Sequence, residues 1–160
     1  MTPRQATPDD VLDIAQMHVQ SWQETYPGLL PASEIASRDL TNRTNLWTQV
    51  LANPDNTTSI IPGVGFALRR PQQDQDLRDT YPFALQSLYV LRTHHGTGAG
   101  IALLAHVTEG AAFTAAVLKG NARAIDFYID AGGIHLKNET DADGYTDHIY
   151  GWSVPIQLRR

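Results

Sequence analysis

The chain has 160 residues, of which 42% are hydrophobic, and a formal net charge of −5 at pH 7. This size and composition predict a single domain, residues 1–160, with its own hydrophobic core. The charge argues against nucleic-acid binding, and no apolar run approaches the ~20 residues that a membrane helix needs. The chain has no cysteine, which excludes disulfides and thiolate catalysis.

Two helices are predicted in the N-terminal third. Residues 7–10 are typical of a helix start, with a capping threonine, a first-turn proline and two carboxylates at the positive helix end. Apolar residues then follow at helical spacing: Leu12, Ala15, Val19 and Trp22. Two prolines and a glycine within 26–31 end this helix. A second helix is predicted over 40–51, with an apolar side formed by Leu46, Trp47, Val50 and Leu51.

The rest of the chain alternates between strands and helices. Strands are predicted at 57–61, 64–68, 83–91, 113–118, 134–137 and 145–154, and helices at 98–110 and 121–131. Pro62-Gly63 and Asp143-Gly144 are typical hairpin turns. The resulting order, β-α-α-β-β-β-α-β-α-β-β, predicts a mixed α/β fold around a central sheet.

Three glycines at alternate positions, Gly96, Gly98 and Gly100, stand between a predicted strand and a predicted helix. Glycine there costs conformational entropy, so the pattern indicates a tight turn or a ligand close to the backbone. The first N–H groups of a helix have no acceptor within it and carry partial positive charge. The arrangement therefore predicts a phosphate-binding site at residues 95–100.

Two familiar nucleotide motifs do not fit this stretch. In a dinucleotide-binding Gly-x-Gly-x-x-Gly pattern the third glycine would come one position later, and an acidic residue would follow on a neighbouring strand. A Walker loop needs Gly-Lys-Ser/Thr, which is absent. A glycine-rich turn without a ligand, or a site for another nucleotide, remains an alternative.

Three segments resemble the GNAT N-acetyltransferases. The segment SLYVLRTHHGTGAGIALLAH (87–106) is similar to the acetyl-CoA signature of that family. VLKGNARAIDFYIDAGG (117–133) resembles its second cofactor segment, and HVQSWQETYPGLLP (18–31) the first-helix segment of one branch. The resemblance implies the GNAT fold and transfer of an acetyl group from acetyl-CoA, the cosubstrate, to an amine.

The resemblance also implies roles for individual residues. The implied cofactor-binding residues are Leu88, Tyr89, Val90, His95, Gly96, Thr97, Gly98, Ala99, Gly100, Asn121 and Tyr128. The pantetheine arm would pass between strands 83–91 and 113–118, and a backbone N–H of residues 88–90 would bind the acetyl oxygen. Tyr128 is the expected catalytic residue, protonating the CoA sulfur; its alternative is a packed core tyrosine. Asn121 is alternatively a plain helix N-cap.

The sequence departs from the family pattern at two positions. His95 stands where arginine or glutamine is usual, and Ala84 stands where many relatives carry a glutamate base. Trp22, Glu24 and Tyr26 fall in the segment that lines the acceptor site in relatives. The candidate bases are His18, Glu24, Tyr26 and His94, and an ordered water chain is an equal alternative.

We therefore expect an N-acetyltransferase that acts on a primary amine of a small molecule or peptide. The alternative is a catalytically weak CoA-binding regulatory domain of the same fold. Four acidic residues near the expected acceptor cleft favour a cationic amine: Glu24, Glu139, Asp141 and Asp143. We expect no metal, because the adjacent pair His94-His95 lacks a third ligand. Residues 1–5 contain no apolar leader, which predicts a cytoplasmic protein. Whether the chain forms a homodimer stays open.

Overall fold

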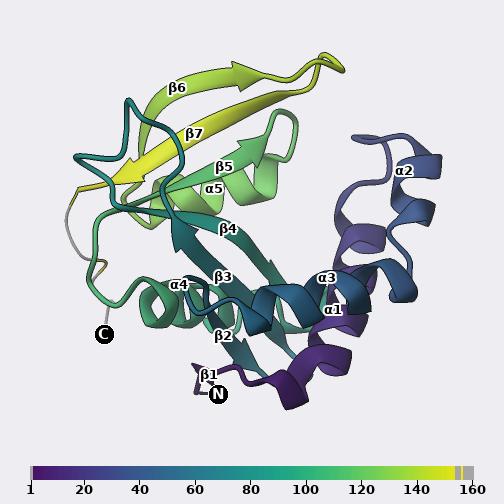
Figure 1. The fold of residues 1–160 in the computed structure, drawn as a ribbon. Helices are drawn as coiled ribbons and strands as arrows, with labels where there is room; N and C mark the ends of the chain where they lie inside the picture. Colours follow the sequence, from purple (N-terminus) through teal and green to yellow (C-terminus); the bar gives the residue numbers. More distant parts are fainter. Residues whose placement is uncertain (1, 154–155, 157–160) are drawn as a thin grey trace.

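The computed structural model describes residues 2–153 and 156 (Figure 1). One seven-stranded sheet crosses the molecule in the order β1-β2-β3-β4-β5-β7-β6. Its strands are β1 (Arg4–Gln5), β2 (Thr57–Ile61), β3 (Gly65–Pro71), β4 (Phe83–Val90), β5 (Phe113–Leu118), β6 (Ile134–Thr140) and β7 (Thr146–Trp152). The helices are α1 (Val11–Thr25), α2 (Ala32–Ser37), α3 (Leu40–Ala52), α4 (Ala99–Thr108) and α5 (Ala122–Asp130), with 3-10 turns η1 (Pro8–Asp10) and η2 (Arg92–His94).

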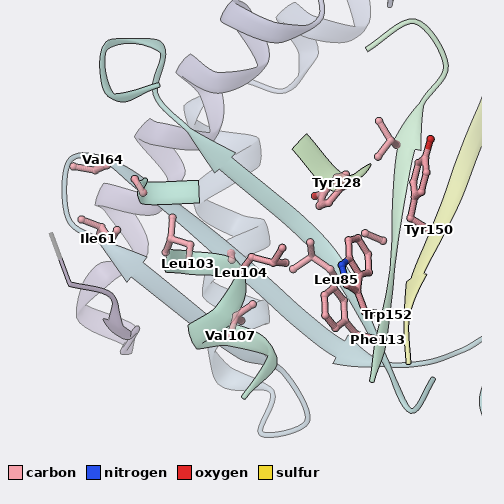
Figure 2. Packing of buried hydrophobic residues seen from close by; sticks show 14 residues of the cluster. Ile61, Val64, Leu85, Leu103, Leu104, Val107, Phe113, Tyr128, Tyr150 and Trp152 are labelled. Carbon is pink, nitrogen blue, oxygen red and sulfur yellow. The ribbon is translucent and has the colours of Figure 1, made fainter. Parts of the chain in front are cut away.

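Helices cover both faces of the sheet and bury a separate hydrophobic cluster on each. Helices α1 and α3 pack with β2 and β3 around Trp47 and Phe66. On the opposite face, α4 and α5 pack against the middle of the sheet around Leu103, Phe113 and Trp152 (Figure 2). The sheet is thus the central layer of a three-layer molecule, and residues that alternate along a strand belong to different clusters.

The predicted mixed α/β fold is confirmed. The strands at 57–61 and 113–118 have the predicted bounds, and the other elements differ by a few residues at their ends. The last predicted strand ends at Trp152, and its final residue, 154, lies outside the described residues. The short helix α2 was not predicted, because none of its six residues is buried and it carries no apolar face.

The predicted apolar sides of the first two helices are partly wrong. Leu12 is 54% exposed and Leu46 is 38% exposed. Helix α1 instead buries Ile14, Ala15, Met17, His18 and Ser21, and α3 buries Arg43 and Trp47. Three polar side chains, His18, Ser21 and Arg43, lie on the inner faces in place of the expected leucines, so hydropathy alone misplaced the buried stripe.

Strands β4 and β5 separate partway along their length. They pair in parallel only over Phe83–Leu85 and Phe113–Ala115, although β4 continues to Val90 and β5 to Leu118. The register between β3 and β4 shifts so that Leu68 faces Ser87 and Arg69 faces Leu85, which leaves Gln86 as an extra residue on β4. Such a bulge bends a strand, and here β4 leaves β5 directly after it.

Candidate active site

A large cleft lies where the predicted phosphate site was placed. Its volume is about 560 Å³, and it is bordered by the end of β4, the turn that leads into α4, and α5. All the predicted cofactor-binding residues line it except Thr97, whose hydroxyl donates to the His94 carbonyl at 2.6 Å. His94, Arg123 and Phe127 also line the cleft.

The three glycines of this turn are required for two different reasons. Gly96 and Gly98 have φ values of +77° and +86°, a left-handed conformation that L side chains rarely adopt. A Cβ atom at either position would have nothing within 4 Å, so the space above the turn is open. A Cβ at Gly100 would lie 3.2 Å from the Phe127 ring, so Gly100 permits close contact between α4 and α5.

The turn presents donors suited to an anion. Helix α4 begins at Ala99, so the N–H groups of its first turn have no acceptor within the helix and point into the cleft end. Their partial positive charge favours an anion, and glycines leave the approach free. The His95 ring folds back against β4, where its Nε2–H donates to the Val90 carbonyl at 2.8 Å. The His95 side chain thus holds the turn against β4, and its other ring nitrogen, Nδ1, takes no part in that hydrogen bond.

A second, smaller cavity of about 60 Å³ lies where β4 and β5 have separated. Tyr26, Ser87 and Ala116 border this cavity but not the large cleft. Tyr128 and Asn121 border both, so the two spaces are neighbours. The Asn121 Oδ1 accepts from the Ala124 N–H at 3.3 Å and caps α5, which fixes the helix that carries Tyr128.

Tyr128 is at once a core residue and a cavity residue. Its side chain is only 6% exposed and packs edge-on against Phe127 and Trp152. Its hydroxyl makes no hydrogen bond with the described part of the chain. Burial raises the pKa of this phenol, so it is protonated at neutral pH. A neutral phenol beside a cavity is a proton donor available to a ligand there.

Trp22 and Tyr26, two of the residues expected to line the acceptor site, belong to an aromatic cluster at the end of α1. The hydroxyls of Tyr26 and Tyr89 lie 2.8 Å apart, and the Trp22 ring packs 4.7 Å from the Tyr26 ring. Burial raises the pKa of both tyrosines, so both remain neutral. Arg43 lies over the Trp22 ring at 4.5 Å, and its Nε and Nη2 atoms are buried without a hydrogen-bond partner. Tyr26 borders the small cavity, whereas Trp22 borders neither space.

The structure places two of the candidate bases in structural contacts. His18 accepts from the Trp47 indole N–H at 3.0 Å, and burial together with Arg43 lowers the pKa of His18 from 6.5 to about 3. A Glu24 carboxylate oxygen accepts from the Arg92 backbone N–H at 3.0 Å, and its carbonyl accepts from the Arg92 guanidinium at 2.7 Å. Neither His18 nor Glu24 borders the cleft or the small cavity.

The other candidate positions lie on different sides of the cavities. His94 borders the large cleft, on the side of the glycine turn. Ala84 lies where β4 and β5 are still paired, opposite Thr114, and borders neither the large cleft nor the small cavity. Sequence reasoning missed one carboxylate near the separation, Asp147 of β7, which pairs with Leu118. Only the register of β7 against β5 brings it there, and no local motif marks it.

The described residues contain neither a candidate metal cluster nor a candidate membrane helix. Within residues 2–153 and 156, no three histidine, aspartate or glutamate side chains gather closely enough to hold a metal ion. None of the helices in the same part of the chain has the length and apolar character to cross a membrane.

Comparison with known proteins shows what the chain is similar to. No family model matches the sequence. The chain is 30% identical over 114 residues to the uncharacterized N-acetyltransferase YuaI of Bacillus subtilis (strain 168), a match that covers 68% of this chain and 63% of YuaI. The matched region therefore spans less than two thirds of the relative.

Solved structures agree over almost the whole chain. PaiA N-acetyltransferase of Thermoplasma acidophilum, in complex with coenzyme A, has a TM-score of 0.69 at 17% identity, covering 91% of this chain and 96% of that one. A GNAT-family acetyltransferase of Bacillus cereus ATCC 10987 has a TM-score of 0.67 at 15% identity, covering 99% and 98%. The chain has the acetyltransferase fold of these proteins. With the similarity to YuaI, this confirms its resemblance to the GNAT family.

Proposed function

We propose that the protein is an N-acetyltransferase that moves an acetyl group from acetyl-CoA to a primary amine of a small molecule or peptide. The observation that carries the proposal is the adjacency of two spaces around Tyr128. One is a cleft of about 560 Å³ that ends at a helix N-terminus, and the other is the cavity between the separated strands. CoA has the matching parts, an anionic pyrophosphate and a long, thin arm that ends at the thiol.

The residues of the turn suit the pyrophosphate. The α4 N-terminal N–H groups would donate to its oxygens, and the open space above Gly96 and Gly98 would admit them. The arm would then follow β4 past Leu88 and Val90 toward Tyr128, since all three border the cleft. The edge of β4 beyond Leu85 has no strand partner on the β5 side, so its backbone groups are available to the arm and to the acetyl oxygen.

The chemistry follows from this placement. The amine nitrogen, as a free base, attacks the thioester carbon, and the C–S bond breaks with its electron pair going to sulfur. Tyr128 would donate its phenolic proton to that sulfur, and the proton that the nitrogen releases to solvent would restore the phenol. Holding amine and thioester together is the largest contribution, since well-oriented reactants gain effective molarities of about 10⁵–10⁸ M.

An acetyl-CoA consumption assay with a panel of amines tests the proposal. The panel would include spermidine, an aryl-ethylamine and a lysine-containing peptide, and titration calorimetry would measure CoA binding. CoA binding with amine-dependent release of CoA thiol is the expected result. CoA binding without turnover of any amine would favour the catalytically weak regulatory domain, and no CoA binding would exclude both.

A further inference from the structure

The register of the sheet places one carboxylate, that of Asp147, beside a residue that borders the small cavity. Along β5, Ala115 and Val117 are buried in the cluster under α4 and α5, so Ala116 and Leu118 lie on the opposite face. Both of these opposite-face residues border the small cavity. Asp147 pairs with Leu118 and therefore lies on that same face.

The tyrosine pair approaches from the neighbouring strand on this same face. Tyr89 pairs with Phe66, which is buried under α1 and α3, and Tyr26 is bonded to Tyr89. Burial is the main cause that raises the pKa of each tyrosine, and the charge of Asp147 adds to it. Tyr26 and Tyr89 border the small cavity from the end of α1 and from β4, and Asp147 of β7 lies beside Leu118, which borders the same cavity.

The charged groups around Asp147 leave its carboxylate available as a base. Its carboxylate has no ion pair or hydrogen bond among the described residues, and its side chain is half-buried. Partial burial, followed by the charges of Asp141 and Glu139, raises its pKa, while His148 lowers it. Lys137 does not neutralise it, because that ammonium is bound to Asp74 at 2.6 Å and to Glu139 at 3.2 Å. From β5, Lys119 follows Leu118, and no ion pair joins it to Asp147.

A second, independent feature points to a ligand in the same place. Tyr128 is nine-tenths buried, its hydroxyl has no hydrogen-bond partner among the described residues, and it borders the small cavity from α5. A carboxylate beside the cavity-lining Leu118 and a neutral phenol that borders the cavity suit opposite ends of one proton-transfer sequence. The acceptor nitrogen would lie between them.

We propose that Asp147 is the general base of the reaction, binding the acceptor as its ammonium ion and removing one proton. This inference rests on the proposed function. The ammonium N–H bond breaks, its proton goes to an Asp147 oxygen, and the nitrogen keeps the electron pair that attacks the thioester carbon. The C–S pair goes to sulfur, which takes its proton from Tyr128. The nitrogen releases its second proton to solvent as the C–S bond breaks, and proton transfer from the Asp147 acid through solvent restores both Asp147 and Tyr128. The substrate class is therefore a cationic amine. With Asp147 as the base, the reaction does not need a second base on β4 at the position of Ala84.

The test compares Asp147→Asn with Asp79→Asn in the full chain. Asp79 is an exposed carboxylate in the loop between β3 and β4, so its variant changes the net charge equally. We expect Asp147→Asn to lose at least ~100-fold in kcat/KM with the first active amine, which is the usual contribution of a positioned base. The CoA affinity and melting temperature of Asp147→Asn should match the wild type, and Asp79→Asn should retain activity within about twofold.

The pH profile separates catalysis from a structural role. Wild-type kcat/KM should rise with pH along a limb with the pKa of Asp147, and Asp147→Asn should lack this limb. Asp147→Ala should regain activity when formate is added, which a purely structural loss would not. If the wild type is active and the Asp147→Asn pH profile has the same height and shape, this inference is overturned but the proposed function is not. Failure of the wild type to acetylate every amine overturns the proposed function as well.

Discussion

The hydroxyl oxygens of Tyr26 and Tyr89 lie 2.8 Å apart, although the residues are 63 positions apart in the sequence. This bond joins the C-terminal end of α1 to the part of β4 that has left β5. It therefore fixes the acceptor side of the small cavity relative to the strand that borders the large cleft.

A double-mutant cycle of Tyr26→Phe and Tyr89→Phe should reveal this bond. Each single variant leaves one partly buried hydroxyl without its partner, and the double variant removes both. We expect the two losses in unfolding free energy to be non-additive by about 0.5–1.5 kcal/mol, measured by urea unfolding. Additive losses would show that the hydroxyls do not interact in solution.

Gly98→Val should abolish or strongly weaken CoA binding. The new side chain would occupy the open space above the turn and strain a backbone with φ of +86°. Gly144→Val is the matched control, because Gly144 has φ of +88° and equally open surroundings in the β6–β7 loop. Calorimetry should show at least a ~10-fold weaker CoA affinity for Gly98→Val only, a loss of about 1.4 kcal/mol or more. Equal affinity in the two variants would place the phosphates elsewhere.

Tyr128→Phe should separate packing from catalysis. The ring contacts persist, and no described residue loses a hydrogen-bond partner, because the Tyr128 hydroxyl bonds to none of them. Melting temperature and CoA affinity should thus stay unchanged, while the single-turnover rate falls by about 10- to 100-fold from loss of one proton donor. The low end is expected because a thiolate, with a thiol pKa near ~8.5, leaves readily. Wild-type turnover in this variant would remove Tyr128 from the mechanism.

His18 should make the protein less stable below neutral pH. Its pKa is lowered from 6.5 in the unfolded chain to about 3 in the folded one, so the unfolded state binds the extra proton between these values. Stability from this group is complete above pH 6.5 and decreases as the pH falls toward 3, by up to about 1.4 kcal/mol per pH unit. Urea unfolding from pH 7.5 to 5 should show this slope in the wild type and His135→Gln, but less in His18→Gln.

The sequence predicts best those features that neighbouring residues determine. The strand at 57–61 was predicted from its apolar run and the Pro62-Gly63 turn, and the structure has the same bounds. The residues placed around the phosphate site, from Leu88 to Gly100, are contiguous along the chain. One strand, one turn and one helix start therefore bring them together without long-range information.

Features that depend on packing between distant segments could not be predicted. The bond between Trp47 and His18 buries a histidine on a face that hydropathy assigned to Leu12 and Val19. Only the register of β7 places Asp147 beside Leu118 of the small cavity, after an acidic loop that looks solvent-exposed in sequence. Neither relationship leaves a periodic or motif signal.

The seam between β4 and β5 is three residue pairs long, so the two halves of the sheet that it joins are only weakly coupled to each other. Strands β1–β4 and β5–β7 meet there through few backbone bonds, so local opening at this seam needs less free energy than unfolding either half. A molecule bound along the seam would contact both halves and restrict their relative fluctuation. Amide protons of β6, which lies two strands away, should thus exchange more slowly with solvent deuterium once CoA is bound. Occupancy of the cleft would then be measurable at the far edge of the sheet.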